Sequence, residues 1–393
     1  MHLDRPWGSF ASLLLLGVVA APLHAQRPAA FAPVSAEVWR GIARGLYPGG
    51  VIVIGRSDTI LYSRGMGHFT WSPRSPVPDP TTSEWDLASL TKVVATAAAA
   101  ARLVDQGALA LDRPVSDILP GFTGEGRELV TVRMLLDHTS GLPSFVPLYR
   151  RAATPAAAWD SLLAVPLLTT PGLLTRYSDL NAMLLGRVLE QLAGEPLDRL
   201  SARLVFEPLG MTHTGFGPLM SARRVVPSQM LGGRPTIGMP SDPNAAFMGG
   251  VAGHAGLFGT GTDLARFAQM WLSDGVVSGR PFLSPATVRS FLAPSASEGG
   301  RRLGWDVPDS AAHPSAFGRL ADSVVVGHTG WTGTFLWLDP ARDLFVVFLT
   351  NRSLDPRRRQ SIVEMREVRA RVSDAAIRAS GGCSPAAPVV AAC

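Results

Sequence analysis

The chain has 393 residues, of which 46% are hydrophobic and 17% charged, so it can bury at least one large core. This composition excludes a mainly disordered protein, and a mass of 41.6 kDa favours two structural lobes over one. The formal net charge is +5, but the basic residues are dispersed apart from the run Arg357, Arg358 and Arg359. Nucleic acid is therefore not predicted as a partner.

The N-terminus has the pattern of a secretory signal peptide. A short charged region precedes an apolar run over residues 10–21, and the small residue Ala25 follows at the position of a cleavage site. The run is too short to span a bilayer, and no Cys follows that could carry a lipid anchor. We predict a signal peptide over residues 1–25, a flexible lead-in over residues 26–33, export to the periplasm or medium, and no stable membrane anchor.

Alternating and helical patterns then predict the elements of one domain over residues 34–379. Helices are expected over residues 35–46, 89–107 and 361–379, a hairpin over 49–55 and 59–64, and strands over 323–326, 333–338 and 344–350. Between residues 112 and 270, helical segments alternate with loops rich in Pro and Gly.

This order predicts an α/β fold of the α+β type. Strands from both chain ends form one antiparallel sheet flanked by helices, and an all-helical lobe lies beside it. The sheet lobe is expected to comprise residues 34–88 and 300–379, and the helical lobe residues 89–299. Residues 380–393 are predicted to be a disordered tail of small residues that contains both cysteines, Cys383 and Cys393.

The single lysine of the chain is the most informative residue. Of 36 Lys and Arg residues only Lys92 is a lysine, and Ser89 precedes it by three positions at the start of an Ala-rich helix. That spacing puts both side chains on one helix face, where a neutral amine can accept the proton of a hydroxyl. An N-cap serine beside a surface lysine is the structural alternative.

Four segments in this order resemble a known enzyme superfamily. They are Ser89-Leu-Thr-Lys92, the run Leu135–Pro143 containing His138-Thr-Ser-Gly141, Tyr177-Ser-Asp179 and His328-Thr-Gly330. Together they resemble the serine β-lactamases and penicillin-binding proteins, most closely the class C-like branch that includes carboxylesterases and D-amino-acid peptidases. The likeness covers residues 34–354 and implies a β-lactamase/transpeptidase-like fold.

The resemblance also implies roles for individual residues. Ser89 would be the nucleophile, Lys92 its proton acceptor and Tyr177 a second acid/base group. The backbone N–H groups of Ser89 and Trp331 would form the oxyanion hole.

Four further residues are predicted to bind substrate: Asp179, His328, Thr329 and Gly330. Two of them depart from the β-lactamase pattern. His328 stands where many β-lactamases have a Lys that holds the lactam carboxylate, and an ordinary histidine is mostly neutral at pH 7. Asp179 stands where Asn is common, and it would repel an anionic substrate unless Arg176 or another cation pairs with it. Both departures favour an esterase or peptidase over an efficient β-lactamase.

Other candidate site residues are interpreted as structural. Asp137 and His138 are adjacent and cannot face each other as a Ser-His-Asp triad requires. His254 is expected to be a hydrogen-bonded structural histidine, whereas Asp242 and Asn244 are left open as substrate contacts. The sequence has no metal-ligand spacing, so neither a metal nor another cofactor is predicted.

The sequence thus predicts an exported serine hydrolase that cleaves small esters or amides through an acyl-serine intermediate, most simply as a carboxylesterase. A D-amino-acid peptidase, a DD-carboxypeptidase or a weak β-lactamase remain alternatives, with a peptidoglycan-like substrate among those considered. A catalytically silent binding protein with the same fold is the alternative of another class. The sequence predicts no oligomeric state.

Overall fold

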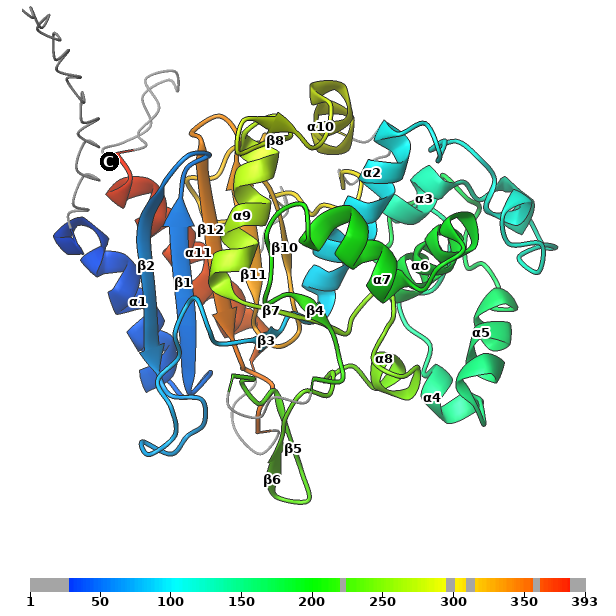
Figure 1. Cartoon of the computed structure of the whole chain (residues 1–393). Coiled ribbons are helices and arrows are strands. Elements are labelled where there is room, and N and C mark those ends of the chain that lie inside the picture. Colours follow the sequence, from blue (N-terminus) through cyan, green and yellow to red (C-terminus); the bar gives the residue numbers. More distant parts are fainter. Residues whose placement is uncertain (1–27, 220–223, 295–300, 309–314, 356–360, 382–393) are drawn as a thin grey trace, which may run out of the picture.

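The computed structural model describes residues 28–219, 224–294, 301–308, 315–355 and 361–381. A sheet with helices on both faces forms one part of the molecule, and a cluster of helices forms the other (Figure 1). The predicted signal peptide and both cysteines of the tail lie outside the described residues.

The main sheet has five antiparallel strands in the order β10-β11-β12-β1-β2. Their bounds are Gly49–Gly55 for β1, Ile60–Gly67 for β2, Val326–Thr329 for β10, Phe335–Asp339 for β11 and Leu344–Thr350 for β12. Because β1 pairs with β12 from Gly50↔Thr350 to Gly55↔Phe345, the two chain ends meet in the middle of the sheet. The predicted sheet built from both termini is confirmed.

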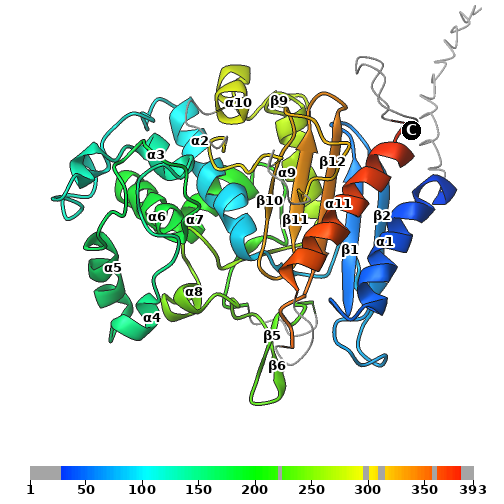
Figure 2. The same ribbon diagram turned by 180° about the vertical axis from the view of Figure 1, so that it is seen from behind.

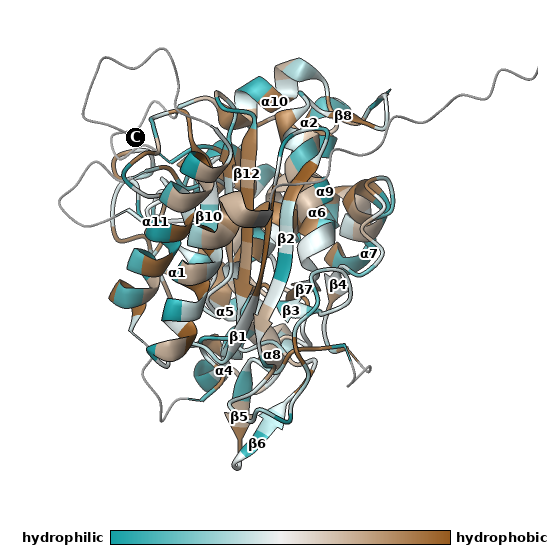
Figure 3. Cartoon of the chain, turned by 90° about the vertical axis from the view of Figure 1, so that its left-hand side faces the viewer, coloured by the Kyte–Doolittle hydropathy of each residue, from teal (hydrophilic) through white to brown (hydrophobic). Residues whose placement is uncertain are grey.

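Helices cover both faces of this sheet because its central strands are apolar on both sides. Every residue of β1 and β12 is buried. Helices α1 (Ala32–Ala43) and α11 (Ile362–Ala379) pack on one face, as the view from behind shows (Figure 2). Figure 3 shows the apolar strand β12 between the helix layers. Helix α9 (Gly261–Leu272) packs against β1 and β12 on the other face, although its residues fall in the range predicted for the helical lobe.

The segment predicted to be a flexible lead-in differs from that expectation. Residues 28–33 form a 3₁₀ turn over Pro28–Phe31 and the first turn of α1. The ring of Phe31 is buried and stacks on Tyr62 of β2, with 5.1 Å between ring centroids. Burial of this aromatic ring anchors the segment to the sheet.

The helical part contains most of the remaining elements. Its helices are α2 (Ala98–Asp105), α3 (Val132–Leu136), α4 (Leu148–Arg151), α5 (Pro155–Leu163), α6 (Asp179–Ala193), α7 (Leu197–Ser201), α8 (Pro243–Phe247) and α10 (Pro285–Leu292), with 3₁₀ turns at Val115–Asp117 and Arg127–Leu129 and a π-helical turn at Ala202–Phe206. Short pairs of strands also occur, namely β5 (Gln229–Leu231) with β6 (Arg234–Thr236) and β8 (Val276–Val277) with β9 (Arg280–Pro281).

The helix predicted over residues 89–107 is a composite. It begins as a 3₁₀ turn at Ala88–Leu90, continues as a π-helix at Lys92–Ala97 and ends as α2 before Gly107. A small sheet of β3 (Trp85–Asp86), β7 (Leu257–Gly259) and β4 (Gly215–Phe216) holds the chain just ahead of it. Within the described ranges, no helix has the length and apolarity needed to cross a bilayer.

Candidate active site

Ser89 is held at the start of the composite helix by a local network. The Asp86 carboxylate accepts hydrogen bonds from the backbone N–H groups of Ala88 and Ser241, at 2.9 and 2.7 Å. Ala88 has a φ of +48°, a left-handed conformation that is unfavourable for a residue with a Cβ. The network therefore sustains a strained turn that presents the Ser89 side chain to a pocket.

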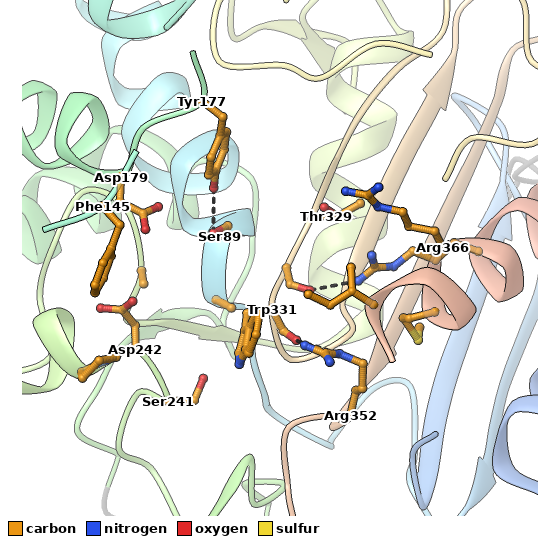
Figure 4. A pocket seen from close by; sticks show the side chains of 17 residues that line it. Ser89, Phe145, Tyr177, Asp179, Ser241, Asp242, Thr329, Trp331, Arg352 and Arg366 are labelled. Carbon is orange, nitrogen blue, oxygen red and sulfur yellow. Dashed lines mark hydrogen bonds between the residues drawn. The ribbon is translucent and has the colours of Figure 1, made fainter. Parts of the chain in front are cut away.

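Two predicted catalytic side chains converge on the Ser89 hydroxyl. Lys92 Nζ donates a hydrogen bond to Ser89 Oγ at 2.9 Å, and Tyr177 OH donates to the same oxygen at 2.9 Å. Figure 4 shows Tyr177 pointing directly at Ser89. The three side chains thus form the compact arrangement that an activated serine needs.

Lys92 is buried, with 3% of its surface exposed, and it is surrounded by acceptors. Besides Ser89, it contacts the carbonyl oxygen of His254 at 3.0 Å and Asp179 Oδ1 at 2.7 Å. Burial lowers the pKa of Lys92, but Asp179 and Tyr177 outweigh burial and leave this pKa above its ordinary value. Lys92 is therefore an ammonium group in the resting site, and it must lose a proton before it can accept one from Ser89.

The structure shows which cation pairs with the Asp179 carboxylate. Its carboxylate pairs with Lys92, not with Arg176, and it also lines the pocket at the start of α6. A substrate therefore meets an ion pair here and not an isolated anion.

Tyr177 lies among aromatic and cationic groups. The Lys92 ammonium and the Arg301 guanidinium lie 5.0 and 5.1 Å from the centre of its ring. The rings of His138 and His328 are 5.0 and 5.9 Å away. Burial raises the pKa of Tyr177, and the opposing effect of Lys92 does not reverse this rise. The phenol is thus protonated at rest. Arg301, which lies close to this ring, is a site residue that the sequence alone did not indicate.

Of the predicted substrate-binding strand residues, Thr329 and Gly330 line the pocket but His328 does not. The His328 side chain is buried behind Tyr177, and its Nδ1 lies 3.0 Å from the carbonyl oxygen of Thr329. Burial, with the nearby cations Arg301 and Lys92, holds the pKa of His328 well below its ordinary value. The His328 side chain is therefore neutral, and its ring lies beside that of Tyr177 and outside the pocket lining.

Trp331 follows in a turn between β10 and β11. Its side chain is 55% exposed at the pocket mouth, and its backbone N–H has no acceptor within the described part of the chain. The hydroxyls of Thr332 and Thr334 donate to the carbonyl oxygens of Asp86 and Leu87, at 2.8 and 3.0 Å. These bonds tie the turn to the residues that precede Ser89.

His138 and His254, the two other histidines considered from the sequence, have structural contacts. His138 has a positive φ of +64°, and its Nδ1 accepts the N–H of Ser178 at 3.1 Å. His254 Nε2 lies 2.8 Å from Asp242 Oδ1, as expected for a hydrogen-bonded histidine. Of the two residues left open, Asp242 lines the pocket, whereas buried Asn244 bonds to the backbone of Val146.

The pocket around Ser89 has a volume of about 580 Å³ and two walls of opposite charge. Asp179 and Asp242 lie on one side, and arginines from the C-terminal part of the chain lie on the other (Figure 4). These arginines are Arg352, Arg366 and Arg369. Nothing in the sequence distinguishes them, because each is one of 35 arginines.

No three His, Cys, Asp or Glu side chains gather closely enough to hold a metal ion among the residues that the structure describes.

Comparisons with known proteins place this geometry in context. The sequence pattern of the family described as Beta-lactamase matches residues 35–369. A Bacillus subtilis (strain 168) protein named N-acetylmuramyl-L-alanine amidase is 33% identical over 374 residues, which cover 84% of each chain. An Escherichia coli (strain K12) protein named "Putative D-alanyl-D-alanine carboxypeptidase" is 32% identical over 346 residues, covering 79% of this chain and 80% of the relative.

One solved structure has a similar fold. The structure of EstCE1, described as a hydrolase with promiscuous acyltransferase activity, superimposes with a TM-score of 0.71 at 24% identity. The match covers 89% of this chain and 98% of the other.

Proposed function

The chain belongs to the beta-lactamase family of serine hydrolases, and from this premise we propose that it is exported and cleaves small esters or amides through an acyl-Ser89 intermediate. The observation that supports this most is the pair of hydrogen bonds to Ser89 Oγ, from Lys92 and Tyr177, at the surface of a pocket. A binding protein that no longer turns over substrate has no need of such an arrangement.

Acylation begins with a proton transfer inside the ion pair. Lys92 gives one proton to Asp179, 2.7 Å away, and the amine so formed accepts the proton of Ser89 Oγ. Ser89 attacks the substrate carbonyl, and the oxyanion accepts hydrogen bonds from the N–H groups of Ser89 and Trp331. As the tetrahedral intermediate collapses, Tyr177 donates its proton to the leaving amine or alcohol.

Deacylation returns each proton. The Tyr177 phenolate, adjacent to the Lys92 cation, removes a proton from water, and the hydroxide attacks the acyl carbonyl. Ser89 leaves with a proton from Lys92, which regains one from Asp179. The site then has its starting protonation, and the products are a carboxylic acid and an amine or alcohol.

Carboxylesterase activity is the first expected outcome. His328 is neutral and buried, so the strand lacks the cation that many β-lactamases place there. Neutral ester substrates do not depend on that cation, whereas a β-lactam carboxylate does.

Hydrolysis of an amide in a cell-wall peptide is the second candidate. Arg366 is exposed and lines the pocket, where it can attract a substrate carboxylate. The names of the two sequence relatives, an N-acetylmuramyl-L-alanine amidase and a D-alanyl-D-alanine carboxypeptidase, point to this substrate class.

One panel of substrates tests these proposals. The purified protein is incubated with p-nitrophenyl butyrate, a D-alanyl-D-alanine peptide, N-acetylmuramyl-L-alanine and nitrocefin, and both turnover and the intact mass are measured. We expect a mass adduct that disappears in Ser89→Ala, with ester turnover well above nitrocefin turnover.

Each other outcome changes the proposal in a defined way. Preferential cleavage of either amide selects the cell-wall candidate, and fast nitrocefin turnover selects a β-lactamase. If no substrate and no fluorophosphonate probe labels Ser89 in folded protein, the binding-protein alternative replaces the enzyme.

Export is tested separately by the mass of the mature chain. Expression of the full gene in a bacterial host, followed by fractionation, should yield a periplasmic protein whose N-terminus lies near Gln26. An uncleaved N-terminus in the cytosolic fraction would contradict the signal peptide.

A further inference from the structure

Arg369 of α11 is a buried cation without a carboxylate partner among the described residues. Only 4% of its surface is exposed, and its Nη2 donates to the carbonyl oxygens of Gly330 and Thr334, at 2.9 and 3.0 Å. Burial, with the neighbouring charges of Arg352 and Arg366, lowers the pKa of Arg369 to about 9. It is still a cation at neutral pH, and such a burial is costly without a compensating role.

The Gly330 carbonyl belongs to a particular peptide group. Its C=O and the N–H of Trp331 are the two ends of one planar unit. This peptide bond is trans, so the two ends point in opposite directions. A carbonyl fixed by Arg369 therefore aims the Trp331 N–H away from Arg369.

The same peptide is confined from the side of the nucleophile. A Cβ on Gly330 would lie 2.7 Å from the carbonyl oxygen of Leu87 and 3.4 Å from the Cβ of Ala88. Gly330 N–H also donates to the Thr334 carbonyl oxygen at 2.8 Å. The turn thus packs against the residues just before Ser89. Gly330 and Thr334 close this turn, and Arg369 donates a hydrogen bond to the carbonyl oxygen of each.

We propose that Arg369 is a positioning residue of the oxyanion hole, which orients and polarises the Gly330–Trp331 peptide through the Gly330 carbonyl oxygen. This inference rests on the proposed function, because the oxyanion forms only if Ser89 attacks a substrate carbonyl. A cation bound to the C=O draws electron density from the peptide and makes its N–H a stronger donor. Arg369 acts without touching the substrate carbonyl.

Arg352 provides a matched control on the neighbouring peptide. Its Nε donates to the Trp331 carbonyl oxygen at 3.1 Å, and its guanidinium lies 4.6 Å from the Trp331 ring centre. That carbonyl shares a peptide with the N–H of Thr332, which is not an oxyanion donor in the proposed mechanism. Both arginines are buried and both bind turn carbonyls, but only Arg369 binds the carbonyl of the oxyanion peptide.

The experiment measures the acyl carbonyl itself. The acyl-enzyme is formed with a ¹³C=O-labelled ester in wild type, Arg369→Gln, Arg369→Lys and Arg352→Gln, and isotope-edited infrared difference spectra are recorded. Stronger oxyanion-hole hydrogen bonds lower the stretching frequency of this carbonyl. We expect its band to move to higher wavenumber in Arg369→Gln, partly to return in Arg369→Lys, and to stay in place in Arg352→Gln.

Kinetics provide a second readout. Loss of an oxyanion-hole donor costs about 10²–10³ in kcat, and weakening one should cost less, about 10- to 100-fold in Arg369→Gln. KM should change little, because the interaction strengthens in the transition state. Arg369→Lys retains the charge, so it gives a partial shift and a partial loss even if Arg369→Gln does not fold.

The alternatives produce different results. An unchanged band with a raised KM only for substrates bearing a carboxylate would make Arg369 a substrate-binding residue and overturn the proposal. Equal band shifts in the Arg352 and Arg369 variants would show a general loosening of the turn, which also overturns it. A wild-type protein that forms no Ser89 adduct would instead refute the proposed function, so the two failures are distinguishable.

Discussion

Two buried cations have different partners: Lys92 lies behind the pocket wall that contains Asp179, and Arg369 belongs to the opposite wall. Lys92 is 3% exposed and pairs with the carboxylate of Asp179, whereas Arg369 is 4% exposed and donates its hydrogen bonds only to backbone carbonyls among the described residues. A lysine can release its proton to a neighbouring carboxylate, and an arginine retains its own. In the proposed mechanism the side of the pocket with Asp179 and Lys92, the Lys92 wall, transfers protons. The side with the three arginines, the Arg369 wall, supplies a fixed charge.

The largest expected effect on the rate of acylation comes from replacing Lys92 by an arginine, the cation of the opposite wall. Lys92→Arg keeps the positive charge and the approximate length, but the guanidinium cannot accept the Ser89 proton. We expect the rate of acylation by p-nitrophenyl butyrate to fall by about 10² or more, while the fold is retained. Stopped-flow release of p-nitrophenol measures the rate, and circular dichroism monitors the fold.

Ser89→Ala sets the background of this measurement. If Lys92→Arg is acylated at nearly the wild-type rate, Lys92 has no proton-transfer role. Both walls would then act only through their fixed positive charge.

A second prediction separates the ion pair from the charge. In Asp179→Asn, burial still lowers the pKa of Lys92, but the opposing carboxylate is gone, so this pKa falls. Even so, Lys92 in this variant must release its proton to solvent instead of to Asp179, so kcat/KM should follow the deprotonation of Lys92 and the ascending limb of its pH profile should move to higher pH. At neutral pH kcat/KM should fall by about tenfold, at the low end of acid/base effects, because the amide cannot store the Lys92 proton.

Asp242→Asn is the control for this shift, because it removes the other carboxylate of the same wall without touching Lys92. A limb that stays in place in Asp179→Asn, or that moves equally in both variants, would mean that Asp179 does not set the proton affinity of Lys92.

The contact between Lys92 and Ser89 could be predicted from the sequence because its signal is local. Ser89 and Lys92 are three residues apart on one helix, and Lys92 stands out as the single lysine. The paired strands β1 and β12 were equally visible as short apolar, β-branched runs near the two chain ends. Helical or strand periodicity within ten to twenty residues sufficed for these elements.

The Arg369 wall could not be predicted in the same way. Arg369 lies 39 residues from Gly330 in the chain, and only the packing of α11 against the sheet brings them together. The abundance of arginine removed any compositional contrast. The protonation of Lys92 was also missed, because it depends on a carboxylate 87 positions away whose pairing the sequence left open.

The smallest expected effect concerns Arg366, the exposed arginine on the same wall. An exposed charge contributes little to binding in high dielectric, so Arg366→Gln should raise KM about two- to fivefold for a peptide with a free carboxylate. The KM for neutral p-nitrophenyl butyrate should not change, and the difference should shrink at high salt. Arg378→Gln, an exposed arginine farther along α11 and outside this pocket, is the matched control. If Arg366→Gln alters kcat for the neutral ester, the charge of Arg366 acts on the reaction itself. In that case the fixed charge of this wall extends beyond the buried arginine to the rim of the pocket.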